Sequence, residues 1–337
     1  MILATRRDNV AVMGENPNPQ QPTSDPSQAS PPVQPEGAPE KRYFCDSPTP
    51  DRDLPAKFAE AVNRLEGALG LPVWLLVQDG GGRSDWDYIS ESVRGTFLKA
   101  RNLGLPRGQK VALLLHSAGG LAQSAYAIAT ILRRHCGEYT AVIPRIAKSA
   151  ATLIALGAEE ILMGEYAELG PIDVQVMDPQ REERLSGLDE VQSLERLNAF
   201  AMRALDQVMF LLAARTGKKV ATLLPDAIRF VTQMTGPMFS NIDVVRYTQM
   251  SRLLRVGEEY ARRLLAARLR EEEADDIARQ LVEKYPEHGF IIDFEEAVRL
   301  GLRPTEPSDE RARIMEEVAE SLGGLTAIGR IRQRGSL

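Results

Sequence analysis

The chain has 337 residues, of which 43% are apolar, 26% charged and 6% aromatic, and its formal net charge is −6. This length is enough for one or two domains with a self-supporting core. The acidic balance argues against a nucleic-acid-binding protein, which needs an excess of basic residues. Cys45 and Cys136 are the two cysteines, so neither a disulfide framework nor a cysteine-based zinc site is expected. A reducing, cytoplasmic location fits this composition.

The N-terminal segment MILATRRDNV lacks the apolar stretch and the small-residue cleavage site of a secretory signal peptide. Apolar stretches such as 208–214 are far shorter than the roughly 20 residues that cross a bilayer. We therefore expect a soluble protein without a transmembrane segment, a reading that leaves peripheral contact with a membrane open.

Residues 1–52 are rich in proline, glutamine and serine, and ten of the 21 prolines lie between Pro17 and Pro50. Such a segment buries too little apolar surface to offset the entropy lost on ordering. We predict that residues 1–52 form a disordered tail.

From Pro55 the sequence alternates between helical periodicity and short apolar runs. Nearly continuous apolar strands between helices are typical of a parallel sheet covered on both faces, so we predict an α/β fold. The predicted strands are 72–78, 111–116, 140–146 and 159–164, and the predicted helices are 57–69, 88–103, 121–135 and one that begins near 150.

Residues 186–285 are predicted to be a mostly helical region, followed by a short strand at 289–293 and a helix up to 302. One more helix and a basic tail complete the chain. The apolar positions of the helical region exceed what one small sheet can cover, so we expect a homo-oligomer. These positions are Leu194, Leu197, Phe200, Leu205, Met209 and Leu212.

Small and polar residues follow the second predicted strand, at the sheet edge where α/β proteins bind ligands. The segment is His116-Ser117-Ala118-Gly119-Gly120. Two glycines let the backbone turn sharply, and N–H groups at the start of the next helix suit an oxyanion or a phosphate. A tight turn without a ligand has the same sequence signature.

A serine follows the third predicted strand, in Lys148-Ser149-Ala150-Ala151. Serine at a helix start is commonly an N-cap. The functional alternative is a nucleophile, because the helix dipole favours its alkoxide and the small alanines leave space for an acyl group. Lys148 is adjacent to Ser149 in the chain, so the two side chains diverge and Lys148 is a poor general base for the serine. We expect Lys148 to face solvent or a partner.

Together, these two segments resemble the ClpP/crotonase superfamily. HSAGG (116–120) and KSAATLIALGAEEILMGEYAELGPID (148–173) are most similar to the serine dehydrogenase proteinases. That subgroup of the peptidases related to signal-peptide peptidase A reads HTPGG, SGGTLIALAADEI and LGPVDPQ. The resemblance extends over 70–304 and is most specific over 110–176. It implies a ClpP/crotonase-like peptidase domain at 53–305, with 306–337 as a C-terminal helix and tail.

The resemblance also implies the roles of individual residues. Ser149 corresponds to the nucleophile, and the backbone N–H groups of Gly119, Gly120 and Ala150 correspond to the oxyanion hole. This chain has Ala118 where the family has proline, and alanines at 150 and 151 where it has glycines. These changes keep every backbone donor but alter the shape of the turns.

The general base stays open at this point. Relatives of signal-peptide peptidase A use a lysine from a later segment, and none lies between Lys148 and Lys218. ClpP has its histidine near the position of Asp173 and its aspartate near the position of His288. We favour His288 as the base over His116, because His116 belongs to the strand that shapes the oxyanion turn. Each histidine can also be structural, and Asp173 remains a further candidate.

The leading function is a serine-type peptidase that cleaves extended polypeptides through an acyl-enzyme, without ATP, a metal or an organic cofactor. The first alternative is a catalytically inactive assembly or binding module with this fold. The second is a crotonase-type acyl-CoA enzyme. Ser149 and the lack of a basic cluster near the first strand disfavour this second alternative.

Overall fold

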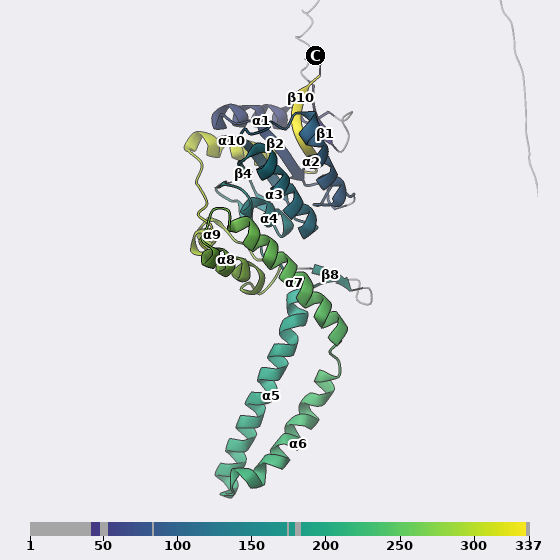
Figure 1. Cartoon of the computed structure of the whole chain (residues 1–337), viewed down its shortest axis with the longest axis vertical. Coiled ribbons are helices and arrows are strands. Elements are labelled where there is room, and N and C mark those ends of the chain that lie inside the picture. The colour runs from purple at the N-terminus through teal and green to yellow at the C-terminus, as the bar shows by residue number, and fades with distance from the viewer. Residues whose placement is uncertain (1–41, 48–52, 83, 174, 179–182, 335–337) are drawn as a thin grey trace, which may run out of the picture. The chain divides into compact units, whose positions relative to one another are not determined.

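The computed structural model describes residues 42–334 except 48–52, 83, 174 and 179–182 (Figure 1). Most of the segment predicted to be a disordered tail, residues 1–41 and 48–52, lies outside the described residues.

The predicted α/β class is confirmed. A mixed sheet has the strand order β1-β10-β2-β3-β4-β6. Its parallel part consists of β2 (Val73–Gln78), β3 (Val111–Ser117), β4 (Tyr139–Ile143) and β6 (Glu160–Met163). Every residue of β2, β3 and β4 is buried, as expected for strands covered on both faces.

Alternate residues of the strands face two separate cores. Leu75 and Val77 face helices α1 (Ala56–Leu69) and α10 (Asp309–Glu320), which lie side by side. Trp74 and Leu76 share the opposite core with the other helices of the sheet. These are α2 (Glu91–Leu103), α3 (Ala122–Cys136) and α4 (Ala150–Leu156).

Two short strands extend the sheet where the parallel strands end. β5 (Ile146–Ala147) pairs with β3 through Ala147 and Ser117, and β7 (Glu168–Leu169) pairs with β5. The two segments that the sequence singled out, 116–120 and 148–151, therefore leave neighbouring strands.

Two predicted boundaries are wrong. Residues 43–47, assigned to the tail, form β1 (Tyr43–Ser47), and the predicted C-terminal tail contains β10 (Thr326–Gln333). β10 lies antiparallel between β1 and β2. These two strands pair with each other across distant segments of the chain, and a backbone ladder of that kind leaves no signal in local periodicity.

The predicted helical region is confirmed as α5 (Gly187–Thr216), α6 (Val220–Phe239), α7 (Val244–Leu265) and α8 (Glu271–Glu283), followed by α9 (Phe294–Arg299). A two-stranded hairpin, β8 (Gln175–Asp178) and β9 (Glu183–Ser186), precedes α5. The strand expected at 289–293 is reduced to one antiparallel bridge between Ile292 and Leu169.

Helices α5 and α6 form a helical hairpin around Gly217, which has φ +65° (Figure 1). By length and composition alone, α5 passes as a membrane-spanning helix, and 6% of its most apolar window is buried. The hairpin exposes large apolar side chains to solvent. They are Phe200, Met202, Phe210, Leu211, Val220, Leu224, Ile228, Phe230 and Met238.

We propose that a second copy of the chain covers the α5–α6 hairpin. The middle of the hairpin exposes charges of both signs, Arg203 and Asp206 on α5 and Asp226 and Arg229 on α6, and its tip exposes Arg215, Lys218 and Lys219. A two-fold partner can pair charges of both signs, whereas moving all these ionised side chains into hydrocarbon carries a large desolvation cost.

Light scattering of the purified protein is expected to give a mass well above the 37.2 kDa of one chain. Replacing Phe210 and Phe230 together with serine removes apolar area that the partner covers, and should shift the mass toward one chain. A wild-type mass of one chain at micromolar concentration would contradict the proposed interface.

Candidate active site

Ser149 adopts a strained backbone conformation at the start of α4. Its φ is 53° and its ψ is −119°, and Arg303 is the one other non-glycine residue with positive φ in the described part of the chain. Such a conformation costs on the order of 1–3 kcal/mol and is concentrated at functional sites. The Ser149 side chain makes no capping hydrogen bond, so the N-cap interpretation is wrong.

Hydrogen bonds of the Thr152 side chain support the strained turn at Ser149. Its hydroxyl is fully buried and lies 2.8 Å from both Ala147 O and Gly170 O, and it accepts a hydrogen bond from Gly170 N. The first turn of α4 is thereby tied to the strand before Ser149 and to the loop after β7.

The Gly119–Gly120 turn packs directly against Ser149. A Cβ added at Gly119 would lie 2.8 Å from Ser149 Cβ, and one added at Gly120 would lie 2.5 Å from Ile89 O. Both glycines also have positive φ, 112° and 150°. These positions accept only glycine without movement of the neighbouring backbone.

Hydrogen bonds orient the peptide between the two glycines. Gly119 O accepts from Ile89 N at 2.8 Å. The C=O and N–H of a trans peptide point in opposite directions, so the Gly120 N–H points away from Ile89. The Gly119 N–H donates to Ser117 Oγ at 3.1 Å. Of the three donors suggested by sequence, the N–H groups of Gly120 and Ala150 are the two without an acceptor among the described residues.

Asp173 and His288 form a close pair. His288 Nδ1 lies 2.6 Å from Asp173 Oδ1, and Ser186 Oγ donates to Asp173 Oδ2 at 2.8 Å. Asp173 is 4% exposed, and the His288 side chain is 21% exposed. Because an ionised carboxylate only accepts hydrogen bonds, this contact assigns the proton to Nδ1 and leaves Nε2 as the free acceptor.

Lys148 joins the segment that contains Ser149 to the loop that contains His288. Its Nζ donates to Gly289 O at 3.2 Å and forms an ion pair with Glu168 at 2.8 Å. Gly289 follows His288, so the residues next to Ser149 and His288 are in direct contact. The expectation that Lys148 faces solvent or a partner is wrong. Among the described residues the Ser149 hydroxyl has no hydrogen bond to either imidazole; such bonds commonly tighten only with substrate.

His116 lies in a different environment from His288. It is 5% exposed, its Nε2 is 3.8 Å from Asp79 Oδ1, and its buried Nδ1 has no hydrogen-bond partner among the described residues. Burial lowers the pKa of His116, and the Asp79 carboxylate only partly offsets this effect. The third histidine, His135, contacts Leu105 O at 2.9 Å and is structural.

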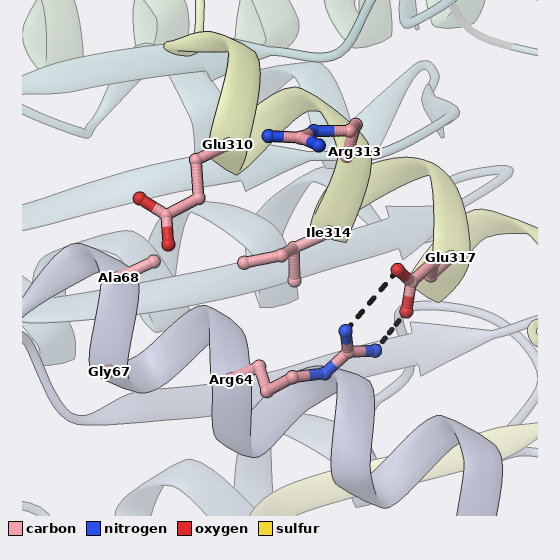
Figure 2. A pocket seen from close by; sticks show the side chains of 7 residues that line it. All are labelled: Arg64, Gly67, Ala68, Glu310, Arg313, Ile314 and Glu317. Carbon is pink, nitrogen blue, oxygen red and sulfur yellow. Dashed lines mark hydrogen bonds and ion pairs between the residues drawn. The ribbon is translucent and has the colours of Figure 1, made fainter.

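A cavity of about 630 Å³ lies away from these residues, between α1 and α10 (Figure 2). It belongs to the sheet face opposite α4 and contains an Arg64–Glu317 ion pair. The residues that line it include neither a histidine nor a serine. They are Arg64, Gly67, Ala68, Glu310, Arg313, Ile314 and Glu317. The described residues contain no cluster of three or more histidine, cysteine or acidic side chains suited to a metal ion.

Residues 88–192 match the model of a family described as ClpP-like SDH-type serine proteinase. This segment is similar to that family. The match contains the glycine turn, Ser149 and Asp173, and it confirms the resemblance found in the sequence. His288 lies outside the matched segment.

Two uncharacterized proteins of Methanocaldococcus jannaschii are also similar to this chain. One is 34% identical over 110 residues, which are 33% of this chain and 34% of the relative. The other is 33% identical over 108 residues, 32% of each protein. The chain thus spans about a third of the length of the curated relatives it matches.

Sequence reasoning missed three residues that support the candidate site. Ser186 donates to Asp173, and Ser117 and Gln78 lie next to the glycine turn. Gln78 had a detectable signal, a polar residue at the end of the apolar run VWLLVQ. Ser186 had none, because its contact depends on the folding of the β8–β9 hairpin.

The substitution His116→Gln is expected to reduce the acid sensitivity of folding. Burial keeps the folded-state pKa of His116 below that of the unfolded chain. Unfolding therefore takes up a proton, and stability falls as the pH drops through about 6.5, the ordinary histidine pKa. The decrease in Tm between about pH 7.5 and pH 5 should be smaller in the variant than in the wild type. An equal decrease in both proteins would refute this assignment.

Proposed function

We propose that this chain is a serine peptidase that hydrolyses polypeptides through an acyl-enzyme on Ser149. The observation that carries the proposal is the strained Ser149 packed against the glycine turn, beside the unpaired N–H groups of Gly120 and Ala150. At the coarser level, the matched family is one of serine proteinases, which are hydrolases.

The reaction begins when Ser149 Oγ attacks the scissile carbonyl carbon. His288 Nε2 takes the hydroxyl proton, and Asp173 holds the ring and stabilises the imidazolium. The N–H groups of Gly120 and Ala150 donate to the oxyanion of the tetrahedral intermediate. His288 returns the proton to the leaving amine, the C–N bond breaks, and a water activated in the same way hydrolyses the acyl-enzyme.

One observation favours an alternative, a binding module that keeps the fold without catalysis. It is the lack of a hydrogen bond between the Ser149 hydroxyl and His288. Covalent labelling separates the two functions, because only an activated serine reacts with a fluorophosphonate.

A fluorophosphonate probe is expected to label the wild-type protein at Ser149 and to leave Ser149→Gly and Ser149→Ala unlabelled. Glycine adopts positive φ without strain, so Ser149→Gly should also raise stability by about 1 kcal/mol, while Ser149→Ala keeps the strain and melts near the wild type. Labelled peptide mapping and thermal melting measure these effects. Labelling at another residue, or none, would refute the proposed nucleophile.

Loss of the base should slow acylation without preventing folding. His288→Ala is expected to lower the labelling rate by roughly 10²–10⁴-fold and to remove the pH-rate inflection of a histidine. Asp173→Asn should also slow labelling, because an asparagine amide favours the wrong ring tautomer. His135→Ala, a half-buried histidine on α3 that contacts Leu105 O, is the matched control. Normal rates in His288→Ala with loss in His116→Ala would reverse the assignment of the base.

A further inference from the structure

Two buried polar side chains lie at the ends of β2 and β3 and have no part in the reaction above. Gln78 is 3% exposed and Ser117 is fully buried. Ser117 Oγ donates to Gln78 Oε1 at 2.8 Å, and Gln78 Nε2 donates to Trp86 O at 2.7 Å. Buried polar groups are retained at little cost only when they are hydrogen-bonded, and these two are bonded to each other.

This hydrogen-bond chain ends on the glycine turn. Ser117 Oγ accepts the Gly119 N–H at 3.1 Å, while Gly119 O accepts from Ile89 N at 2.8 Å. Both sides of Gly119 are therefore fixed, and both connections lead to the segment that contains Trp86 and Ile89. The peptide plane that carries the Gly120 N–H has no remaining freedom to rotate without breaking one of these bonds.

Strand register places Ser117 between the two parts of the proposed site. Ser117 is the direct partner of Gln78 on one side and of Ala147 on the other. Ala147 lies two residues before Ser149, so a shift at Ser117 moves the oxyanion turn relative to the nucleophile.

Gln78 also sets the direction of the Ser117 hydroxyl. The Gln78 Nε2 bond to Trp86 O leaves Oε1 facing Ser117. The Ser117 proton then points at Gln78, and an oxygen lone pair is left to accept from Gly119.

We propose that Ser117 and Gln78 are positioning residues that hold the oxyanion turn and thereby set the rate of acylation. The proposal rests on the peptidase function proposed above. Loss of an oxyanion donor costs roughly 10²–10³ in kcat in a well-studied peptidase. Displacing the Gly120 donor without removing it should cost less, about tenfold to a hundredfold.

The test compares Ser117→Ala, Ser117→Thr and Gln78→Leu with a matched control, Thr140→Val. Thr140 is a buried residue on β4, and its hydroxyl bonds to Glu160 on β6. Ser117→Thr keeps the oxygen that accepts from Gly119. The measurements are kcat and KM on a peptide ester, the rate of fluorophosphonate labelling, and the affinity for a peptide aldehyde, whose adduct places an oxyanion in the hole.

Ser117→Ala and Gln78→Leu are expected to lose tenfold to a hundredfold in kcat and in aldehyde affinity, with little change in KM. Ser117→Thr and Thr140→Val should stay near the wild type. Normal kcat in Ser117→Ala, or an equal loss in Ser117→Thr or Thr140→Val, would overturn the proposal, because a general packing defect does not discriminate among these variants.

Hydrogen exchange separates failure of this proposal from failure of the peptidase function. The Gly119 amide loses its acceptor in Ser117→Ala, so the peptide covering 116–122 should exchange faster than in the wild type even if neither protein is active. Unchanged exchange there overturns the positioning role. If the fluorophosphonate probe does not label the wild-type protein but exchange is faster in Ser117→Ala, the peptidase function is overturned. The role of Ser117 in holding the glycine turn would then still stand.

Discussion

The close approach of the Gly119 turn to Ser149 is the contact on which the proposed active site depends. A Cβ at Gly119 would lie 2.8 Å from both Lys148 O and Ser149 Cβ, so a larger residue has to push the turn and the nucleophile apart. β5 brings the two segments together, because its Ala147 pairs with Ser117 at the end of β3. The separation of nucleophile and oxyanion donors is thus set by the fixed spacing of neighbouring strands.

The proposed acid–base pair is assembled by a longer-range contact. His288 lies 115 positions after Asp173, in the loop between α8 and α9. Relative to the ClpP pattern, the histidine and the aspartate have exchanged places along the chain. Peptidases on unrelated folds reach one geometry from different chain orders, so the exchange does not prevent the chemistry. It does require the loop around His288 to be held in place, and the Lys148 contact to Gly289 O supplies that support.

The strands of the parallel core could be predicted from sequence because a short apolar run such as VWLLVQ is the pattern of a strand that is buried on both faces. β1 and β10 could not, since their stability comes from a ladder between the two ends of the chain. For the site, sequence named Ser149, Asp173 and His288 but did not pair the last two, because a hydrogen bond between distant segments leaves no local pattern. The sequence also could not show that Ser117 Oγ accepts a hydrogen bond from the Gly119 N–H, since the segment HSAGG identifies backbone donors but not the directions in which they point.

Burial of the Asp173 carboxylate needs compensation, and three groups supply it. His288 and Ser186 each bond one oxygen, and Ser186 is also the N-cap of α5, whose hydroxyl accepts from Leu188 N. The carboxylate therefore lies next to a helix N-terminus, where partial positive charge stabilises an anion. The first residues of α5 hold the carboxylate that orients the proposed base, and the rest of α5 forms the exposed hairpin. Ser186 bonds both to Asp173 and to the first turn of α5, so the position of α5 and the position of the Asp173 carboxylate are physically linked.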